Sequence, residues 1–543
     1  MFIKSVLLSF SSIFFQIFHQ IRKIYLNSPI YNRKISKIDD KTIIYKPSQN
    51  ILSCLIKFDK KKYNIEDFSL NSIWKNSLNL NNKNFNKLHS FFWLFTLDLR
   101  SSQKITQNII HNWIEENDKY KQNIWNVDIL SKRIIAWISN SKLTYENADS
   151  NYKLHFNILI KKQTNHLINE IKRSKKLDDK IIGSTAIILV GLTYGDNYYL
   201  KFGIDILRQL LNFSLDSSNF PKSRNLRQLV FYLKYLIVIR ELLKESQTNI
   251  PDFLDEKIFY LGKSYNLLCA HRKYGILFNG NFDESCFEFD NYLNLHKYKF
   301  KDDFNETGGY VVLKNKKSLL TMDIGKVPDK KFSKDYQAGL FSFEFNFLGE
   351  KVITNSGYFQ DFKHQLNIIS KSSATHSTLV LDNMSTVRFE RNNEGHMLVN
   401  KNFKILDKEV KSDKNFWLIK ASHDAYSKNY GLIHERKIGY FHDKYKLEGC
   451  DRLIKTKNFK SSNFVIRFHL LPDINLTKLL NNQTILIENK NAGWKFTCKN
   501  HKIDIETGLY FGMKNKYLEN KNIMITGITK PEEQSIIWEI SKV

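Results

Sequence analysis

The chain has 543 residues, of which 42% are hydrophobic and 14% aromatic, and it contains only 7 Pro and 21 Gly. This length allows two or more domains, and this composition excludes a disordered chain and a Pro/Gly-rich linker protein. The formal net charge is +28, which attracts polyanions such as nucleic acids, anionic membranes or acidic polysaccharides. The lysines are spread along the chain without a basic tail, and Lys, Asn, Ile and Phe are abundant together, as an AT-rich genome would also produce.

The N-terminal segment, residues 1–30, contains an apolar run from Val6 to Phe18. The run resembles the apolar core of a signal peptide, but it is short for a membrane span and no cleavage site between small residues follows it. Its phenylalanines recur at helical spacing, which also fits an amphipathic helix on the protein body or on a membrane surface. Peripheral membrane contact through residues 6–23 is one prediction from this pattern.

Residues 31–280 are predicted to form a helical domain. Apolar residues recur there every three or four positions, as in helices with one buried face. The predicted helices are Leu88 to Arg100, Leu130 to Ile138, Ile182 to Tyr194 and Leu226 to Leu243. Periodicity alone does not distinguish a helical bundle from a toroid.

Residues 281–305 are predicted to be a connector and residues 306–543 a β domain. Phe341, Phe343, Phe345 and Phe347 alternate with polar residues, which predicts a half-buried strand, and a returning strand follows. Many short strands separated by Asn, Asp, Gly and Lys turns indicate an antiparallel sandwich. The predicted fold is therefore an α+β multidomain chain, helical first and then a β-sandwich. The predicted strands are Tyr310 to Leu313, Ser318 to Asp323, Phe341 to Phe347, Lys351 to Thr354, Ser373 to Leu381, Phe416 to Ala421, Lys437 to Phe441, Phe464 to Leu471, Thr484 to Glu488, Trp494 to Cys498, Ile503 to Thr507, Ile523 to Ile528 and Ile536 to Ile540.

Several common motifs are absent from the sequence. It has no GxGxxG, GxxxxGK[ST], HExxH or GxSxG. The motifs typical of dinucleotide-dependent redox enzymes, nucleotide hydrolases, zincins and serine hydrolases are therefore missing. No nucleic-acid module is visible either, and no nucleic-acid partner is predicted. The five cysteines form no CxxC pair and predict neither a zinc site nor a disulfide scaffold; we expect them to be small buried side chains.

Three polar clusters could carry chemistry. Arg224 and Asn225 precede the Leu226 helix, as a plain N-cap or as an arginine presented into a cleft. His376 enters a predicted strand, as a satisfied core histidine or as a reactive group. His434 and Arg436 share one strand face, as a surface pair or as groups that bind a carboxylate or tune a tyrosine.

Taken together, several segments resemble the heparinase II/III-like family. No one of them is decisive, but their order and spacing are specific. They are Arg133-Ile134-Ile135-Ala136-Trp137, Leu277-Phe278-Asn279-Gly280, Phe341-Ser342-Phe343-Glu344, Asn355-Ser356-Gly357, Ala374-Thr375-His376-Ser377-Thr378, His423-Asp424-Ala425-Tyr426, His434-Glu435-Arg436 and Arg467-Phe468-His469.

The resemblance implies an N-terminal α/α toroid, a C-terminal antiparallel β-sandwich and a polysaccharide lyase acting on uronate-containing acidic glycans. Such lyases work by β-elimination. A base removes the proton next to the uronate carboxylate, an acid protonates the departing glycosidic oxygen, and a third group neutralises the carboxylate. The family uses Tyr and His for proton transfer, with Asn, Arg or another group beside them.

The sequence departs from the lyase pattern at positions that matter. Gln337 and Gly339 stand where characterised lyases carry His-x-Asp, and Asn355 stands at a metal-ligand position of several members, so we predict no bound metal and no cofactor. The resemblance leaves Tyr358, His376 and His434 as catalytic candidates. It leaves Arg224, Asn225, Asn355 and Arg436 as substrate-binding candidates.

The first functional hypothesis is a lyase of an acidic polysaccharide, with its active site between toroid and sandwich. The second is a non-catalytic glycan-binding or envelope-assembly protein on the same scaffold. The third is a glycan hydrolase, which needs two carboxylates across a cleft, and no such pair can be identified. The family's usual location suggests the cell envelope or periplasm, and the cytoplasm is the alternative.

Overall fold

The structure is a computed structural model that describes residues 17–18, 20–56, 81–98, 100–301, 303–401, 403–480, 482–490 and 492–543. Most of the N-terminal apolar run, and with it most of the predicted membrane-contact segment 6–23, lies outside these residues. In the described part of the chain, no helix combines the length and the apolar character that crossing a bilayer requires.

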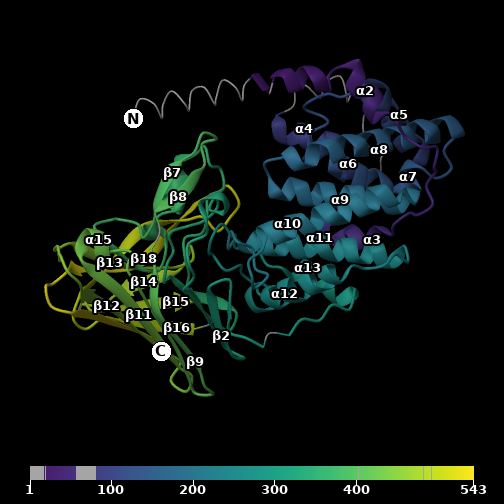
Figure 1. Cartoon of the computed structure of the whole chain (residues 1–543). Coiled ribbons are helices and arrows are strands. Elements are labelled where there is room, and N and C mark those ends of the chain that lie inside the picture. The colour runs from purple at the N-terminus through teal and green to yellow at the C-terminus, as the bar shows by residue number, and fades with distance from the viewer. Residues whose placement is uncertain are drawn as a thin grey trace. The chain divides into compact units, whose positions relative to one another are not determined.

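The chain divides into two compact units (Figure 1). The first comprises Met1–Phe213 with Lys234–Glu256, and the second comprises Ser214–Leu233 with Lys257–Val543. This division differs from the predicted limits at residues 280 and 306, because two helical stretches of the chain pack with the strands. The predicted connector 281–305 also contains a helix, α13, Phe287–Leu295.

The first unit is helical. Its helices include α6, Val127–Ser139, which packs against α8, Ser150–Glu170, and α9, Leu177–Tyr194. Helix α9 is apolar on almost every side, and its residues from Ile181 to Tyr194 are buried, as the sequence pattern predicts. The other α-helices among the described residues of both units are α2, Pro29–Ile35; α3, Gln49–Leu52; α4, Asn82–His89; α5, Gln103–Asn117; α7, Ser141–Thr144; α10, Asn197–Ser214; α11, Leu226–Glu245; α12, Asp252–Leu268; α14, Gln365–Ser370; and α15, Ser427–Tyr430.

The continuous helix predicted from Leu88 to Arg100 is wrong. Helix α4 ends at His89, and a short 3-10 helix, η4, follows over Phe92–Thr96. Between them Phe91 has a φ of 56°, in the left-handed region that breaks a helix. Phe91 is fully buried against Trp113 and Trp137, so tertiary packing holds this conformation.

The second unit contains antiparallel sheets. One has the order β1-β2-β3-β4-β5, one the order β14-β15-β16-β19-β12-β11-β10-β9, and one the order β17-β18-β13-β6, with β7 and β8 forming a separate hairpin. The strands are β1, Glu306–Thr307; β2, Tyr310–Lys314; β3, Ser318–Asp323; β4, Phe343–Phe347; β5, Glu350–Ile353; β6, Leu379–Leu381; β7, Arg388–Arg391; β8, Met397–Lys401; β9, Ile405–Ser412; β10, Phe416–His423; β11, Leu432–Phe441; β12, Lys446–Lys455; β13, Asn463–His469; β14, Asn475–Lys478; β15, Thr484–Asn489; β16, Ala492–Thr497; β17, Lys502–Tyr510; β18, Leu518–Ile528; and β19, Gln534–Lys542.

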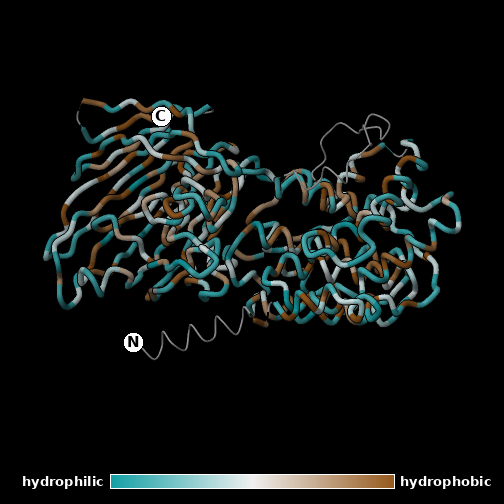
Figure 2. Tube along the Cα trace, turned by 90° about the horizontal axis from the view of Figure 1, so that it is seen from above, coloured by the Kyte–Doolittle hydropathy of each residue, from teal (hydrophilic) through white to brown (hydrophobic). Residues whose placement is uncertain are grey.

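The three larger sheets share one hydrophobic core. Phe343 of β4 stacks on Trp538 of β19 with ring centroids 5.5 Å apart, and Phe468 of β13 meets the same Trp538 at 4.8 Å. The alternating phenylalanines of the predicted hairpin are therefore core residues, as the period of two indicates. Brown and teal stretches follow one another along the strands in Figure 2.

His376 lies before a strand and not within one. Residues Ser373–Thr375 form the 3-10 helix η7, and β6 begins only at Leu379. The Thr378 N–H donates to the His376 carbonyl at 2.8 Å, which closes a tight turn at the histidine. The predicted placement of His376 within a strand from Ser373 to Leu381 is therefore wrong.

Candidate functional site

The start of α11 carries Arg224 and Asn225. The Asn225 Oδ1 accepts the Arg227 N–H at 2.9 Å, which is an N-cap, as predicted. Arg224 has a φ of 58°, so the chain turns sharply before the helix. These two neighbouring side chains reach different partners within the second unit.

The Arg224 guanidinium is buried in a network of loops. It donates to the carbonyls of Gly308, Lys326 and Gly309 at 2.8, 3.2 and 3.3 Å. Its Nη2 also donates to Asp323 Oδ1 at 2.6 Å. Burial alone would lower the pKa of Arg224, but the Asp323 carboxylate outweighs it and raises that pKa. All three guanidinium nitrogens are thus held by the protein.

Asn279 and Tyr310 complete this network. The Asn279 Nδ2 lies 3.2 Å from Asp323 Oδ2 and 2.5 Å from the Tyr310 hydroxyl, which donates to the Arg224 carbonyl at 2.6 Å. The Tyr310 ring also lies 4.6 Å from the guanidinium carbon. The Leu277-to-Gly280 segment is therefore joined to the start of α11 through buried polar contacts.

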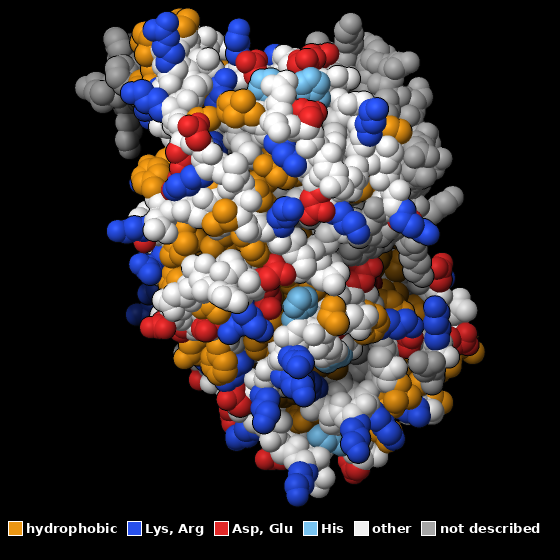
Figure 3. All heavy atoms as spheres, turned by 90° about the vertical axis from the view of Figure 1, so that its right-hand side faces the viewer, with side chains coloured by type: hydrophobic (Ala, Val, Ile, Leu, Met, Phe, Trp, Pro, Cys, Tyr) orange, Lys and Arg blue, Asp and Glu red, His pale blue; other side chains and the backbone are white. Residues whose placement is uncertain are grey.

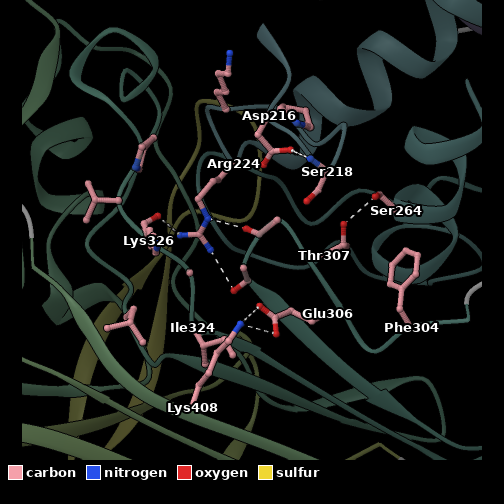
Figure 4. A pocket seen from close by; sticks show the side chains of 18 of the residues that line it. Asp216, Ser218, Arg224, Ser264, Phe304, Glu306, Thr307, Ile324, Lys326 and Lys408 are labelled. Carbon is pink, nitrogen blue, oxygen red and sulfur yellow. Dashed lines mark hydrogen bonds and ion pairs between the residues drawn. The ribbon is translucent and has the colours of Figure 1, made fainter. Parts of the chain in front are cut away.

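Arg224 lines a cavity of about 1190 Å³ (Figure 4). Lys408 and Glu306 form an ion pair on its wall, with the Lys408 Nζ 2.7 Å from Glu306 Oε1. Phe304 and Lys326 lie on other walls. A cavity of this size is large enough for a small saccharide, and its lining mixes acidic, basic and aromatic side chains.

The Asp335 carboxylate is contacted by several polar side chains. The Asn225 Nδ2 donates to Asp335 Oδ2 at 3.0 Å, and the Tyr358 hydroxyl donates to Asp335 Oδ1 at 3.1 Å. The Arg227 Nη2 lies 3.6 Å from the same carboxylate. The Asp335 side chain is 31% exposed, so this cluster reaches the surface of the second unit. We call Asn225, Arg227, Asp335 and Tyr358 the Asp335 cluster.

Tyr358 is buried, with only 2% of its surface exposed. Burial, the Asp335 charge and the hydrogen bond to it raise the pKa of the Tyr358 hydroxyl, and the nearby Arg227 charge offsets only part of this rise. The hydroxyl is therefore protonated at neutral pH, as a proton donor requires. Lys371 lies on the ring side of Tyr358, its Nζ 5.9 Å from the ring centroid, and burial lowers the pKa of Lys371 to about 8.

His376 lies under the loop that carries Gly339. Its Nδ1 is 2.9 Å from the Ser372 carbonyl, while its Nε2 has no hydrogen-bond partner in the described part of the chain. Burial lowers the pKa of His376 to about 4, so the ring is neutral at pH 7. The side chain is 1% exposed, so a substrate reaches it only if the covering loop moves.

Asn355 and Gln337 are held by backbone groups around this histidine. The Asn355 Oδ1 accepts the Ser377 N–H at 2.9 Å. The Gln337 side chain accepts the Gly280 N–H at 3.0 Å and donates to the Gly357 and Ser370 carbonyls at 2.8 and 2.6 Å. Gln337 therefore ties the loops together at the position where the resemblance would place a histidine.

Replacing Gly339 by Ala is expected to destabilise the protein by roughly 1–3 kcal/mol, because an added methyl group overpacks a filled site. A Cβ at Gly339 would lie 2.5 Å from Cδ2 of the His376 ring. Urea unfolding measures the loss of stability, and the His376 ring signals in NMR spectra are expected to shift.

The matched control is Gly493→Ala in β16, where the nearest atom to an added Cβ is 3.7 Å away. We expect that variant to unfold within about 1 kcal/mol of the parent protein. Equal stability of the two variants would show that the His376 ring yields to the methyl group.

The predicted roles of His434 and Arg436 are not supported. Both side chains are fully buried inside the sandwich, where β11 pairs with β12 so that Arg436 is opposite Asp451. Arg436 Nε and Nη2 donate to the two Asp451 oxygens at 2.7 and 2.9 Å, and His434 Nε2 lies 2.7 Å from Asp451 Oδ1. These groups form a buried ion pair that stabilises the sheet, and they have no route to a substrate without opening the core.

The structure thus separates the predicted site residues into groups. Asn225 and Tyr358 meet at Asp335, Arg224 is tied to Asp323, His376 and Asn355 lie beneath the Gly339 loop, and His434 and Arg436 lie in the sandwich core. Sequence reasoning missed Asp323, Asp335 and Arg227. Asp335 stands two residues before Gln337, the position compared above with the His-x-Asp motif, and this closeness in sequence was the signal that could have pointed to Asp335.

The basic side chains on the face drawn in Figure 3 do not gather into one patch. On the face drawn in Figure 3, Lys and Arg side chains are scattered among Asp and Glu side chains. Many lysines are paired, for example Lys330 with Glu390 and Lys478 with Asp504. A diffuse positive field attracts anions weakly and in a salt-dependent way.

Comparisons with known proteins agree with this fold. Residues 301–539 match the family model described as Heparinase II/III-like, C-terminal. A mutant of the heparan sulfate lyase HepC from Pedobacter heparinus matches with a TM-score of 0.67 and 13% identity, over 85% of this chain and 77% of that chain. A structure of heparinase III matches with a TM-score of 0.66 and 13% identity, over 94% and 88%. A second heparinase III gene product matches with a TM-score of 0.68 and 14% identity, over 85% and 79%.

None of the curated proteins matches the chain. At identities of 13% to 14% the structural likeness establishes the fold. The predicted fold, an α/α toroid followed by an antiparallel β-sandwich, is confirmed.

Proposed function

We propose that the chain, whose residues 301–539 match the Heparinase II/III-like, C-terminal family model, is a polysaccharide lyase that cleaves a uronate-containing acidic glycan by β-elimination. In this reaction the proton beside the uronate carboxylate is removed and the bond to the glycosidic oxygen breaks. The new sugar end carries a carbon–carbon double bond, and the departing oxygen receives a proton.

The Asp335 cluster is the observation that carries this proposal. It joins a protonated tyrosine, an amide and a guanidinium on a carboxylate that reaches the surface. Tyr358 is the proposed proton donor to the departing oxygen, and its hydroxyl, whose pKa is raised, carries a proton at neutral pH. Asn225 and Arg227 bind the uronate carboxylate and stabilise the charge that develops there. Asp335 orients both Tyr358 and Asn225.

His376 is the proposed base. Its ring is neutral at pH 7 because burial lowers its pKa to about 4, and its Nε2 is unpartnered among the described residues. A base with so low a pKa is weak, so the reaction depends on carboxylate neutralisation by Asn225 and Arg227. Proton removal by His376 also requires the Gly339 loop to move, since the ring is covered.

A non-catalytic glycan-binding protein on the same scaffold is the second candidate. The covered His376 ring favours this candidate. So does Gln337, because its side-chain amide is hydrogen-bonded to the backbone of Gly280, Gly357 and Ser370. Such a protein would bind an acidic glycan through the Asp335 cluster without breaking it.

The test is to incubate purified protein with a panel of uronate polysaccharides and to follow the absorbance of unsaturated uronate. A lyase releases absorbing product from at least one of them, and Asp335→Asn slows that release. The matched control is Asp361→Asn, an exposed carboxylate shortly after Tyr358 in the chain, which is expected to keep full activity. Glycan binding without product supports the second candidate, and neither binding nor product contradicts both.

A further inference from the structure

Two helical segments near the start of the chain are held against one face of α8. Residues 20–26 are helical, and Arg22 in this segment forms an ion pair with Glu170, its Nε lying 3.3 Å from Glu170 Oε2. In α2 the Tyr31 hydroxyl lies 2.8 Å from His166 Nδ1. His166 and Glu170 stand four positions apart in α8, so they lie on the same face of that helix.

Burial identifies the inner side of each segment. Leu26 is buried on the first segment, and Tyr31 and Ile35 are buried on α2. The rings of Tyr25 and Tyr31 also meet edge to face, with centroids 5.1 Å apart, which joins the two segments to each other. Each segment therefore has a fixed inner side, and the residues on its opposite side point away from α8.

The outer side of the first segment is apolar. Ile17, Ile21 and Ile24 are 54%, 60% and 71% exposed. They are spaced by four and three positions, so they form one stripe along the helix. Phe18 on the same segment and Ile30 on α2 are also exposed. We call this surface the N-terminal stripe, and it comprises Ile17, Phe18, Ile21, Ile24 and Ile30.

The charged residues next to the stripe are basic. Residues 17–38 contain no acidic residue, and their basic residues are Arg22, Lys23, Arg33, Lys34 and Lys37. In α2, Arg33 and Lys34 follow Ile30 by three and four positions, so they share its exposed side. An apolar stripe flanked by cations matches the interface of an anionic bilayer, where apolar side chains reach the acyl boundary and cations meet phosphate groups.

We propose that the N-terminal stripe docks the protein peripherally on a membrane that contains anionic phospholipids. The two segments lie in the plane of the interface, with their inner sides held by α8 and their isoleucines in the lipid. Protein interfaces are enriched in Tyr, Trp, Met and Arg, whereas aliphatic side chains with only basic neighbours are typical of helices that lie on bilayers. This inference does not depend on the proposed lyase activity.

The test is flotation of the purified full-length protein with vesicles of phosphatidylcholine and phosphatidylglycerol in equal parts, and with vesicles of phosphatidylcholine alone. We expect binding to the mixed vesicles and at least tenfold weaker binding to the neutral ones, because each basic residue near an anionic surface adds about fivefold in affinity. The net charge of +28 also attracts the whole chain to anionic vesicles. Variants that leave the charge unchanged separate this attraction from docking through the stripe.

Replacing Ile24 by Ser tests the stripe at constant charge. Ile24 is the most exposed isoleucine of the first segment. We expect Ile24→Ser to bind the mixed vesicles about tenfold more weakly than the parent protein, since it removes one aliphatic side chain from the lipid. The difference is expected to persist at 0.5 M NaCl, where the attraction between charges is screened.

The matched control is Ile44→Ser, because Ile44 is 73% exposed and belongs to the same unit. The Ile44 N–H donates to the Thr193 carbonyl at the end of α9. There the Tyr194 hydroxyl donates to Asn157 of α8 at 2.8 Å. Asn157 lies about 20 Å along α8 from Glu170, so Ile44 is remote from the stripe. This variant should bind vesicles as the parent protein does.

Both substitutions are at exposed positions, so the circular dichroism spectra of the variants should overlay that of the parent protein. Equal vesicle binding by Ile24→Ser and the parent, or no binding by the parent to either kind of vesicle, would overturn the proposal. So would a dimer that Ile24→Ser dissociates and that binds no vesicles, because a second copy would then cover the stripe. Vesicle binding is measured without a glycan, so its failure is distinct from a failure of the proposed lyase activity.

Discussion

Replacing Tyr358 by Phe is expected to lower the rate of unsaturated-product release by about 10²–10⁴-fold, the usual contribution of a positioned acid. The change removes one oxygen and keeps the ring in its buried site. Because the pKa of the Tyr358 hydroxyl is raised, the hydroxyl is protonated at neutral pH, and its loss removes the proton for the departing oxygen. Initial rates at several substrate concentrations are expected to show the loss in kcat, with KM nearly unchanged.

The matched control is Tyr517→Phe, which removes a hydroxyl from an exposed tyrosine of the same unit. It should retain the parent rate. Circular dichroism spectra of both variants should overlay that of the parent protein. A Tyr358→Phe variant with full activity would exclude this tyrosine as the proton donor and leave Lys371 as the nearest alternative with a pKa in range.

Replacing Arg436 by Met is expected to cost about 3–5 kcal/mol of unfolding free energy, the usual loss when one partner of a buried ion pair is removed. The remaining Asp451 carboxylate would then be buried with His434 and the Trp538 indole N–H as its side-chain partners. Arg436 also donates to the Phe341 and Ser377 carbonyls at 2.9 and 2.7 Å, so the change also disturbs the residue that directly follows His376. Chemical unfolding followed by tryptophan fluorescence measures the loss.

The control for this change is Arg452→Met on the neighbouring position of β12. Arg452 is partly exposed and pairs with Glu533 and Glu435 at the surface, so we expect a loss below about 1 kcal/mol. Similar losses for the two variants would mean that the buried pair adds nothing beyond a surface pair.

The same ion pair predicts acid sensitivity. Burial alone would raise the pKa of Asp451, but Arg436 and His434 lower it far below its usual range. A carboxyl with a depressed pKa stabilises the fold above its unfolded pKa of about 4, and this stability is lost as the pH falls. In Arg436→Met the pKa of Asp451 rises, so the loss of stability on acidification is expected to begin at a higher pH than in the parent protein.

The regular elements of this protein could be read from local patterns. Helix α9 and the β4–β5 hairpin were predicted because their apolar residues repeat at the helical and strand periods. Strand β12 was missed, since Gly449 and Asp451 interrupt its buried face. The structure explains why these two residues occupy the buried face. A Cβ at Gly449 would lie 1.9 Å from the Trp538 ring, and Asp451 pairs with Arg436.

The candidate site could be read only in part. Tyr358 and Asn225 were named from the sequence, but they are 133 positions apart, and nothing local indicates that they share a carboxylate. Asp335 has no periodic pattern around it, because it lies in an irregular loop. His434 and Arg436 were chosen as reactive groups, since a sequence does not show that Asp451 faces them across a sheet.

Periodicity was therefore enough to predict a helical domain followed by an antiparallel β-sandwich, because the pattern repeats over many residues, whereas the α/α toroid came from the resemblance to the family. The location of the chain in the cell stays a prediction from the usual location of the family. Which polar groups meet, whether at Asp335 or in the Arg436 ion pair, was decided by contacts between distant segments. Such contacts depend on strand register and loop path, and no local pattern encodes either.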